Sequence, residues 1–171
     1  MIDWKKCHNG LMLCTFEQAV KLMPEVAPIL DQLKPHLEFN EDQYLVDVKV
    51  HMLMPNQYPC IPNWHRDFMP RDDKGNRIKD KPSKLKMYMW ISGAPLTEYK
   101  DKLTGKIFTK SAQQWHSFTQ EDLHRGTKSK EHTWRCFIRV IPKQFVHKTT
   151  TNIGQIRRHS QVYLDAEKFH W

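Results

Sequence analysis

The feature that most limits the fold is a series of short segments between residues 44 and 141 in which apolar and polar residues alternate. In the first, residues 44–54, valines at every second position alternate with Asp47, Lys49 and His51. This pattern is typical of a strand with one buried face. The further strand candidates are residues 85–91, 105–109, 115–119, 123–125 and 133–141. Many short strands with turn residues between them predict a sandwich or barrel.

The N-terminal part of the chain has a different pattern. Thr15 followed by Gln18 is typical of a capping box, and apolar residues then recur at helical spacing until Pro35. We therefore expect residues 1–40 to be helical and to cover one outer face of a core formed by residues 44–141. Residues 142–171 are a polar, basic extension. A length of 171 residues suits one domain that contains all three parts.

Composition excludes several classes of protein. No run of about 18 apolar residues occurs, so we expect no membrane span. The first residues carry no apolar signal core, and the four cysteines form no CxxC pair. We therefore expect reduced cysteines and a cytoplasmic location, which for a protein made inside a host cell is the host cytoplasm.

Positive charge is concentrated toward the end of the chain. The net charge is +8, and residues 123–171 hold ten lysines and arginines against three acidic residues. Such a surface favours an anionic partner, for example a nucleic acid or a nucleotide. The alternative is a basic surface with no dedicated partner.

Two histidines and an aspartate form a candidate metal site. His65 and Asp67 are two residues apart, so in an extended strand both side chains point the same way. His124 is the best candidate for a second imidazole from another strand, and His116 is its competitor. Two imidazoles and one carboxylate hold iron on one face and leave the other coordination positions open.

The strand at 133–141 carries a candidate anion-binding arginine. Trp134, Cys136, Ile138 and Val140 form one apolar face that can pack under the helices, whereas Arg135 and Arg139 lie on the opposite face with Phe137. An arginine that points into a barrel needs an anion, because burying an unpaired charge is costly. A dicarboxylate supplies one, and arginine binds carboxylates bidentately. A structural ion pair at the mouth of the barrel is the alternative.

His65-Arg66-Asp67, then His124, then Arg135 resembles the Fe(II)/2-oxoglutarate-dependent oxygenase superfamily, which includes small phage-encoded members. The resemblance covers residues 47–141. It implies a double-stranded β-helix, the jelly-roll fold of cupins, with Fe(II) held by His65, Asp67 and His124. It also implies that Arg135 binds the distal carboxylate of 2-oxoglutarate.

The same resemblance suggests supporting roles for other residues. Arg139 would help to bind the co-substrate or an anionic substrate, and Tyr88 or Trp90 would donate a hydrogen bond to the co-substrate, with His51 as a weaker candidate. Many relatives carry a hydroxyl residue two positions after the arginine, where this chain has Phe137.

The expected activity is hydroxylation or demethylation of an anionic substrate, without catalytic residues beyond the metal ligands. Residues 70–82, a charged loop, would close over the substrate. Two alternatives stand beside this hypothesis. One is a non-catalytic jelly-roll protein that binds a nucleotide, a nucleic acid or a host protein. The other is a cupin-like enzyme with another metal, in which His116 joins the ligands.

Overall fold

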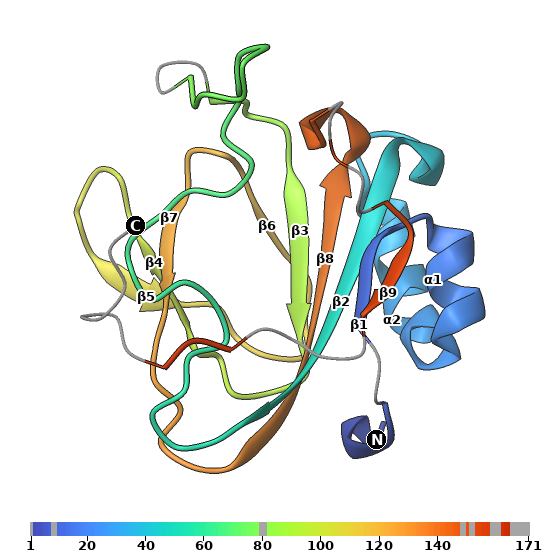
Figure 1. The fold of residues 1–171 in the computed structure, drawn as a ribbon, viewed down its shortest axis with the longest axis vertical. Helices are drawn as coiled ribbons and strands as arrows, with labels where there is room; N and C mark the ends of the chain where they lie inside the picture. The colour runs from blue at the N-terminus through green and yellow to red at the C-terminus, as the bar shows by residue number, and fades with distance from the viewer. Residues whose placement is uncertain are drawn as a thin grey trace.

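The strands form two antiparallel sheets that face each other (Figure 1). The computed structural model describes residues 2–7, 10–78, 82–147, 150, 153–157 and 162–164. Within these residues the large sheet has the strand order β6-β3-β8-β2-β1-β9, and the small sheet has the order β5-β4-β7. The strands are β1 (Gly10–Cys14), β2 (Tyr44–Leu53), β3 (Met87–Ile91), β4 (Thr97–Lys100), β5 (Ile107–Thr109), β6 (His116–Phe118), β7 (Leu123–Gly126), β8 (Thr133–Pro142) and β9 (Gln155–Arg157).

Two short α-helices cover the outer face of the large sheet (Figure 1). The helices are α1 (Phe16–Leu22) and α2 (Ala27–Leu33), with 3-10 turns at Trp4–Lys6, Pro24–Val26, Lys34–His36, Glu41–Gln43 and Lys143–Phe145. The capping box is confirmed, since the Thr15 hydroxyl accepts from the Gln18 amide at 3.1 Å and the Gln18 side chain accepts from the Thr15 amide at 2.9 Å. Among the described residues, no helix has the length and apolar character needed to cross a bilayer.

Strand β2 is the centre of the molecule and is covered on both faces. Its valines pack against the helices together with Cys136, Ile138 and Val140 of β8. Its other face points toward the small sheet, where Asp47 is 3% and His51 is 1% exposed. The expectation of a half-buried strand is therefore wrong, because the second sheet covers the polar face. That polar face lines a cavity instead of meeting solvent.

The prediction of a mainly β protein with N-terminal helices is confirmed. Two stacked antiparallel sheets are consistent with a β-sandwich; the finer jelly-roll form stays a prediction. Three strands had no sequence signal. Strand β1 lies within the N-terminal part and pairs with β2, β4 joins β5 to β7, and β9 of the C-terminal extension pairs with β1. Trp134 is 38% exposed at the start of β8, so the apolar face under the helices begins at Cys136.

Candidate metal centre

A backbone pairing brings the two predicted histidines together. The His65 amide donates to the His124 carbonyl at 2.9 Å, and the His124 amide donates to the His65 carbonyl at 3.0 Å. Directly opposed residues of an antiparallel pair present their side chains on the same face. The imidazole centroids are 4.4 Å apart as a result. His65 belongs to a segment outside the named strands, and His124 belongs to β7. These two segments together form one side of the site.

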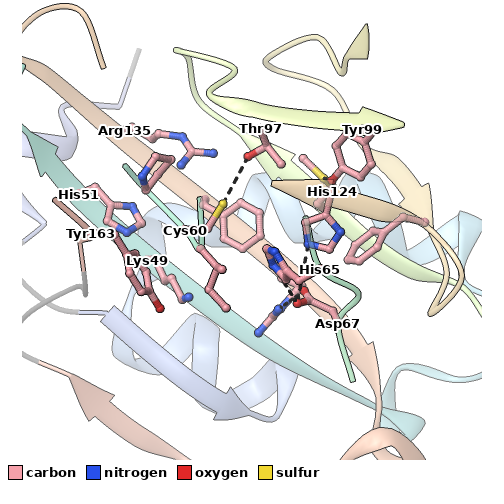
Figure 2. A pocket seen from close by; sticks show the side chains of 16 residues that line it. Lys49, His51, Cys60, His65, Asp67, Thr97, Tyr99, His124, Arg135 and Tyr163 are labelled. Carbon is pink, nitrogen blue, oxygen red and sulfur yellow. Dashed lines mark hydrogen bonds and ion pairs between the residues drawn. The ribbon is translucent and has the colours of Figure 1, made fainter. Parts of the chain in front are cut away.

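Asp67 completes a triad with these two rings (Figure 2). Its Oδ1 atom lies 3.7 Å from His65 Nε2 and 3.7 Å from His124 Nε2. The three potential ligand atoms all lie within 4.8 Å of one another. With metal–ligand bonds of about 2.1 Å, neighbouring ligands of an octahedral ion are about 3 Å apart. Movements of less than about 1 Å would therefore let the triad close on an ion.

The histidines are held in the tautomer that a metal requires. His65 Nδ1 lies 2.8 Å from the Asn63 carbonyl oxygen, and His124 Nδ1 lies 3.1 Å from the Asp122 carbonyl oxygen. Carbonyl oxygens only accept, so each Nδ1 carries a proton, and the neutral form of each ring has its lone pair on Nε2, on the side of the triad. Burial, and secondarily His124, lowers the pKa of His65 below its usual value. The neutral, ligating form of His65 is favoured at neutral pH.

Arg139 holds the third ligand in place. Its Nη1 donates to Asp67 Oδ2 at 2.6 Å, which leaves Oδ1 facing the imidazoles. Its Nη2 and Nε donate to Asp47 Oδ2 at 2.6 and 3.2 Å. The other oxygen of Asp47 accepts from the Leu13 amide at 2.8 Å. Burial opposes ionisation of Asp67, but Arg139 and the two histidines outweigh it and lower the pKa of this carboxyl.

Arg139 binds two carboxylates of the protein itself. Sequence reasoning placed it at the co-substrate or an anionic substrate, whereas the structure engages it with two carboxylates, Asp47 and Asp67. Strands β2 and β8 pair with Asp47 directly opposite Arg139, so the register of the large sheet brings the two side chains of this ion pair together. Arg139 therefore orients a candidate metal ligand, and such outer partners normally tune metal affinity.

The triad opens into a cavity between the two sheets. The cavity volume is about 110 Å³, several times the ~15 Å³ that one water molecule needs. Figure 2 shows side chains from β2, β4, β7 and β8 around it. Besides the triad it is lined by Lys49, His51, Pro59, Cys60, Ile61, Met89, Thr97, Tyr99, Phe118, Arg135, Phe137, Arg139 and Tyr163.

Arg135 lies in this cavity as a charge without a counter-ion. Its side chain is 2% exposed, and Nε and Nη2 have no hydrogen-bond partner among the described residues. Burial lowers its pKa, and the thiols of Cys60 and Cys136 and the Tyr99 phenol oppose that shift only in part. No carboxylate forms an ion pair with it within the described part of the chain. A buried guanidinium left in this state costs free energy unless an anion enters the cavity.

Tyr88 and Trp90 are not brought to the site. Both belong to the core cluster between the large sheet and the helices, where the Tyr88 hydroxyl donates to the His36 carbonyl at 3.1 Å and Trp90 lies against Trp4. Side chains alternate along β3, so Met89 faces the cavity instead. His116 is also elsewhere, with its Nε2 2.8 Å from the Ser111 carbonyl oxygen. His51 does line the cavity.

Several cavity residues were missed by sequence reasoning. Lys49 was visible on the polar face of the alternating strand, but Thr97 and Tyr99 belong to the unpredicted strand β4. Tyr163 comes from the C-terminal extension, where its backbone forms two hydrogen bonds with Tyr58 at 2.8 and 3.0 Å. Within the C-terminal extension, Tyr163 is thus paired with the body of the protein; residues 165–171 lie outside the described residues.

Neither the protein-family models nor the curated proteins contain a match to this sequence.

Proposed function

We propose that the protein is an Fe(II)- and 2-oxoglutarate-dependent oxygenase with a jelly-roll fold, which hydroxylates or demethylates an anionic substrate. One observation carries the proposal: an open triad of His65, Asp67 and His124 shares a cavity with the unpaired buried guanidinium of Arg135. A metal face and an anion site within one small cavity fit a ligand that chelates a metal at one end and carries a carboxylate at the other.

The donor set fits Fe(II). Two neutral imidazoles and one ionised carboxylate occupy one face of an octahedral ion and leave positions open for exchangeable ligands. When bound, Fe(II) with 2-oxoglutarate supplies activation of dioxygen for oxidation of a substrate C–H bond. The triad residues would hold the ion, and Arg139, which donates to Asp67 Oδ2, would keep Oδ1 turned toward it.

Arg135 would bind the distal carboxylate of 2-oxoglutarate. Its two unpartnered nitrogens match the two oxygens of a carboxylate, and the ligand removes the cost of the lone charge. Phe137 replaces the hydroxyl residue found here in many relatives, with its ring centroid 5.7 Å from Arg135 Cζ. Thr97 lines the same cavity and is the candidate to replace that hydroxyl. The closely packed walls would exclude water from the reaction.

Thermal unfolding under anaerobic conditions tests the proposal. Fe(II) and 2-oxoglutarate together should raise the melting temperature more than the sum of their separate effects, because each ligand binds better beside the other. Asp67→Asn, which keeps the size of the side chain, should abolish both effects. Arg135→Met should abolish only the effect of 2-oxoglutarate. Formation of succinate in air would then establish turnover.

Other results would favour the alternatives. Stabilisation by 2-oxoglutarate that survives Asp67→Asn and needs no metal would identify an anion-binding protein without oxygenase chemistry. Stabilisation by a metal with no response to 2-oxoglutarate would favour a cupin-like enzyme with a different reaction. The absence of any response to iron, alone or with 2-oxoglutarate, would refute the proposed function.

A further inference from the structure

A second, larger hollow lies behind the Asp67–Arg139 ion pair. Its volume is about 580 Å³, and Arg139 lines both this hollow and the metal cavity. We call it the arginine groove because Arg66, Arg71 and Arg77 line it as well. Asp47 is the one carboxylate among the lining residues described, and Arg139 already binds it. The groove therefore presents a strong excess of positive charge immediately beside a metal ligand.

Two of these arginines are forced together by the backbone. Arg71 and Arg77 are directly opposed in a tight hairpin, between the hydrogen bonds Asp72 amide to Asn76 carbonyl at 2.9 Å and Ile78 amide to Pro70 carbonyl at 2.7 Å. Opposed residues between such bonds are the closely spaced kind, and like charges in this position repel.

The hairpin is nevertheless well ordered by local contacts. The Asp72 carboxylate accepts from the amides of Lys74 and Asn76, and Gly75 takes a positive φ of 84° at the turn. Arg71 donates to the Gly75 carbonyl at 2.6 Å. Arg66, Arg71 and Arg77 form no ion pair within the described part of the chain. A hydrogen-bonded hairpin that holds two arginines side by side without an ion pair is suited to a ligand with repeated negative charges.

Aromatic rings line the same groove. Phe68 and Phe145 are among its lining residues and are partly buried against the apolar core, and Arg139 Cζ lies 4.6 Å from the centroid of Phe68. The Phe68 backbone has φ = 50°, an unfavourable value for a large side chain. Buried Gln120 holds it there, because its amide donates to the Phe68 carbonyl at 2.5 Å while its oxygen accepts from the Ser83 amide at 2.7 Å. These contacts fix the Phe68 ring against Arg139 at the wall of the groove.

We propose that the arginine groove binds single-stranded nucleic acid, with phosphates at Arg66, Arg71 and Arg77 and bases against Phe68 and Phe145. Arginines with interleaved aromatic rings are the combination that single strands use, whereas a duplex keeps its bases inside the stack. The inference rests on the proposed function, since it names the substrate that the metal centre would oxidise. Arg139 lines the groove and binds Asp67, so a bound strand would pass close to the centre.

Fluorescence anisotropy with a labelled single strand of about 12 nucleotides tests this inference. The double variant Arg71→Ala/Arg77→Ala should bind about tenfold or more weakly at low salt, and its salt dependence, log K against log[salt], should be shallower by about 1.4. Lys21→Ala/Lys106→Ala is the matched control, because it removes the same charge from exposed positions outside the groove. The control should retain the wild-type salt dependence.

Two further probes separate the ligand classes. An abasic chain with the same number of phosphates should bind about tenfold more weakly than the oligonucleotide, because it lacks bases to stack. A duplex or polyglutamate that binds as tightly as the single strand would overturn the inference. So would equal losses in the two double variants, or no binding of the oligonucleotide by the wild-type protein.

Stability without nucleic acid gives an independent check. The Arg71→Ala/Arg77→Ala protein should melt at the same temperature as the wild type or higher, because the substitutions relieve repulsion. A clearly lower melting temperature would show that the arginines are structural and would overturn the inference. Stabilisation by Fe(II) and 2-oxoglutarate should persist in this variant. A wrong inference about nucleic-acid binding can therefore be distinguished from a wrong proposed function.

Discussion

Replacing Arg135 with methionine should make the ligand-free protein more stable while it abolishes binding of 2-oxoglutarate. The side chain is 2% exposed, and two of its nitrogens have no hydrogen-bond partner among the described residues. Replacing buried charges by apolar side chains of similar size is often neutral or stabilising, by up to about 4 kcal/mol. We expect a gain of about 1–3 kcal/mol in the free energy of unfolding. For a chain of this length each kcal/mol raises the melting temperature by about 2–4 °C.

Urea unfolding with and without ligand measures both effects. With Fe(II) present under anaerobic conditions, 2-oxoglutarate at about 100 times its Kd should add about 2.7 kcal/mol to the wild-type protein and almost nothing to Arg135→Met. Arg77→Met, at an exposed arginine of the hairpin, is the control and should change the stability by less than about 0.5 kcal/mol. A variant that is less stable than wild type without ligand, yet still responds to 2-oxoglutarate, would refute the reasoning.

Further predictions concern the metal ligands and their support. Arg139→Met should weaken metal binding about 10–100-fold in competition with a chelator, since Asp67 loses its orienting partner; it should also destabilise the protein by about 3–5 kcal/mol, because Asp47 is left buried without a cation. The pKa of His65 is lower in the folded protein, so the unfolded chain takes up a proton first as the pH falls. The free energy of unfolding of the metal-free protein should therefore decrease as the pH falls below about 6.5. In urea titrations, His65→Gln should make this decrease with pH less steep. His116→Ala should leave metal affinity unchanged, and a large loss in calorimetric titration would place this ring in the site.

The sequence allowed His65, Asp67 and His124 to be grouped correctly, because these residue types are few and their order along the chain is restrictive. Their convergence depends on the pairing of His65 with His124, and no local pattern encodes a pairing across 59 positions. Arg135 was recognisable for a different reason. It lies with Arg139 on the face of the strand opposite the apolar one, and a charge that points into a barrel has to be explained by a partner.

Other features carried no usable signal. In strand β3 both faces are apolar, so the alternation could not tell whether Met89 or Tyr88 faces the cavity; the position of the helices decides it. Strand β4 is four residues long and mixes polar and aromatic side chains, so only its neighbours β5 and β7 make it a strand. The ion pair of Arg139 with Asp47 could not be predicted, because Asp47 lies 92 residues away and is identified only by the sheet register.

The hydrogen bond at Leu13 links the N-terminal strand to the metal centre. Leu13 sits in the irregular part of β1 with φ = 52°, and its amide donates to Asp47 instead of to the neighbouring strand. Leu13, Asp47, Arg139 and Asp67 thus form one continuous chain of charge-assisted contacts. Binding of a metal at the centre should consequently slow hydrogen exchange of the Leu13 amide proton, although this amide lies in a distant part of the chain.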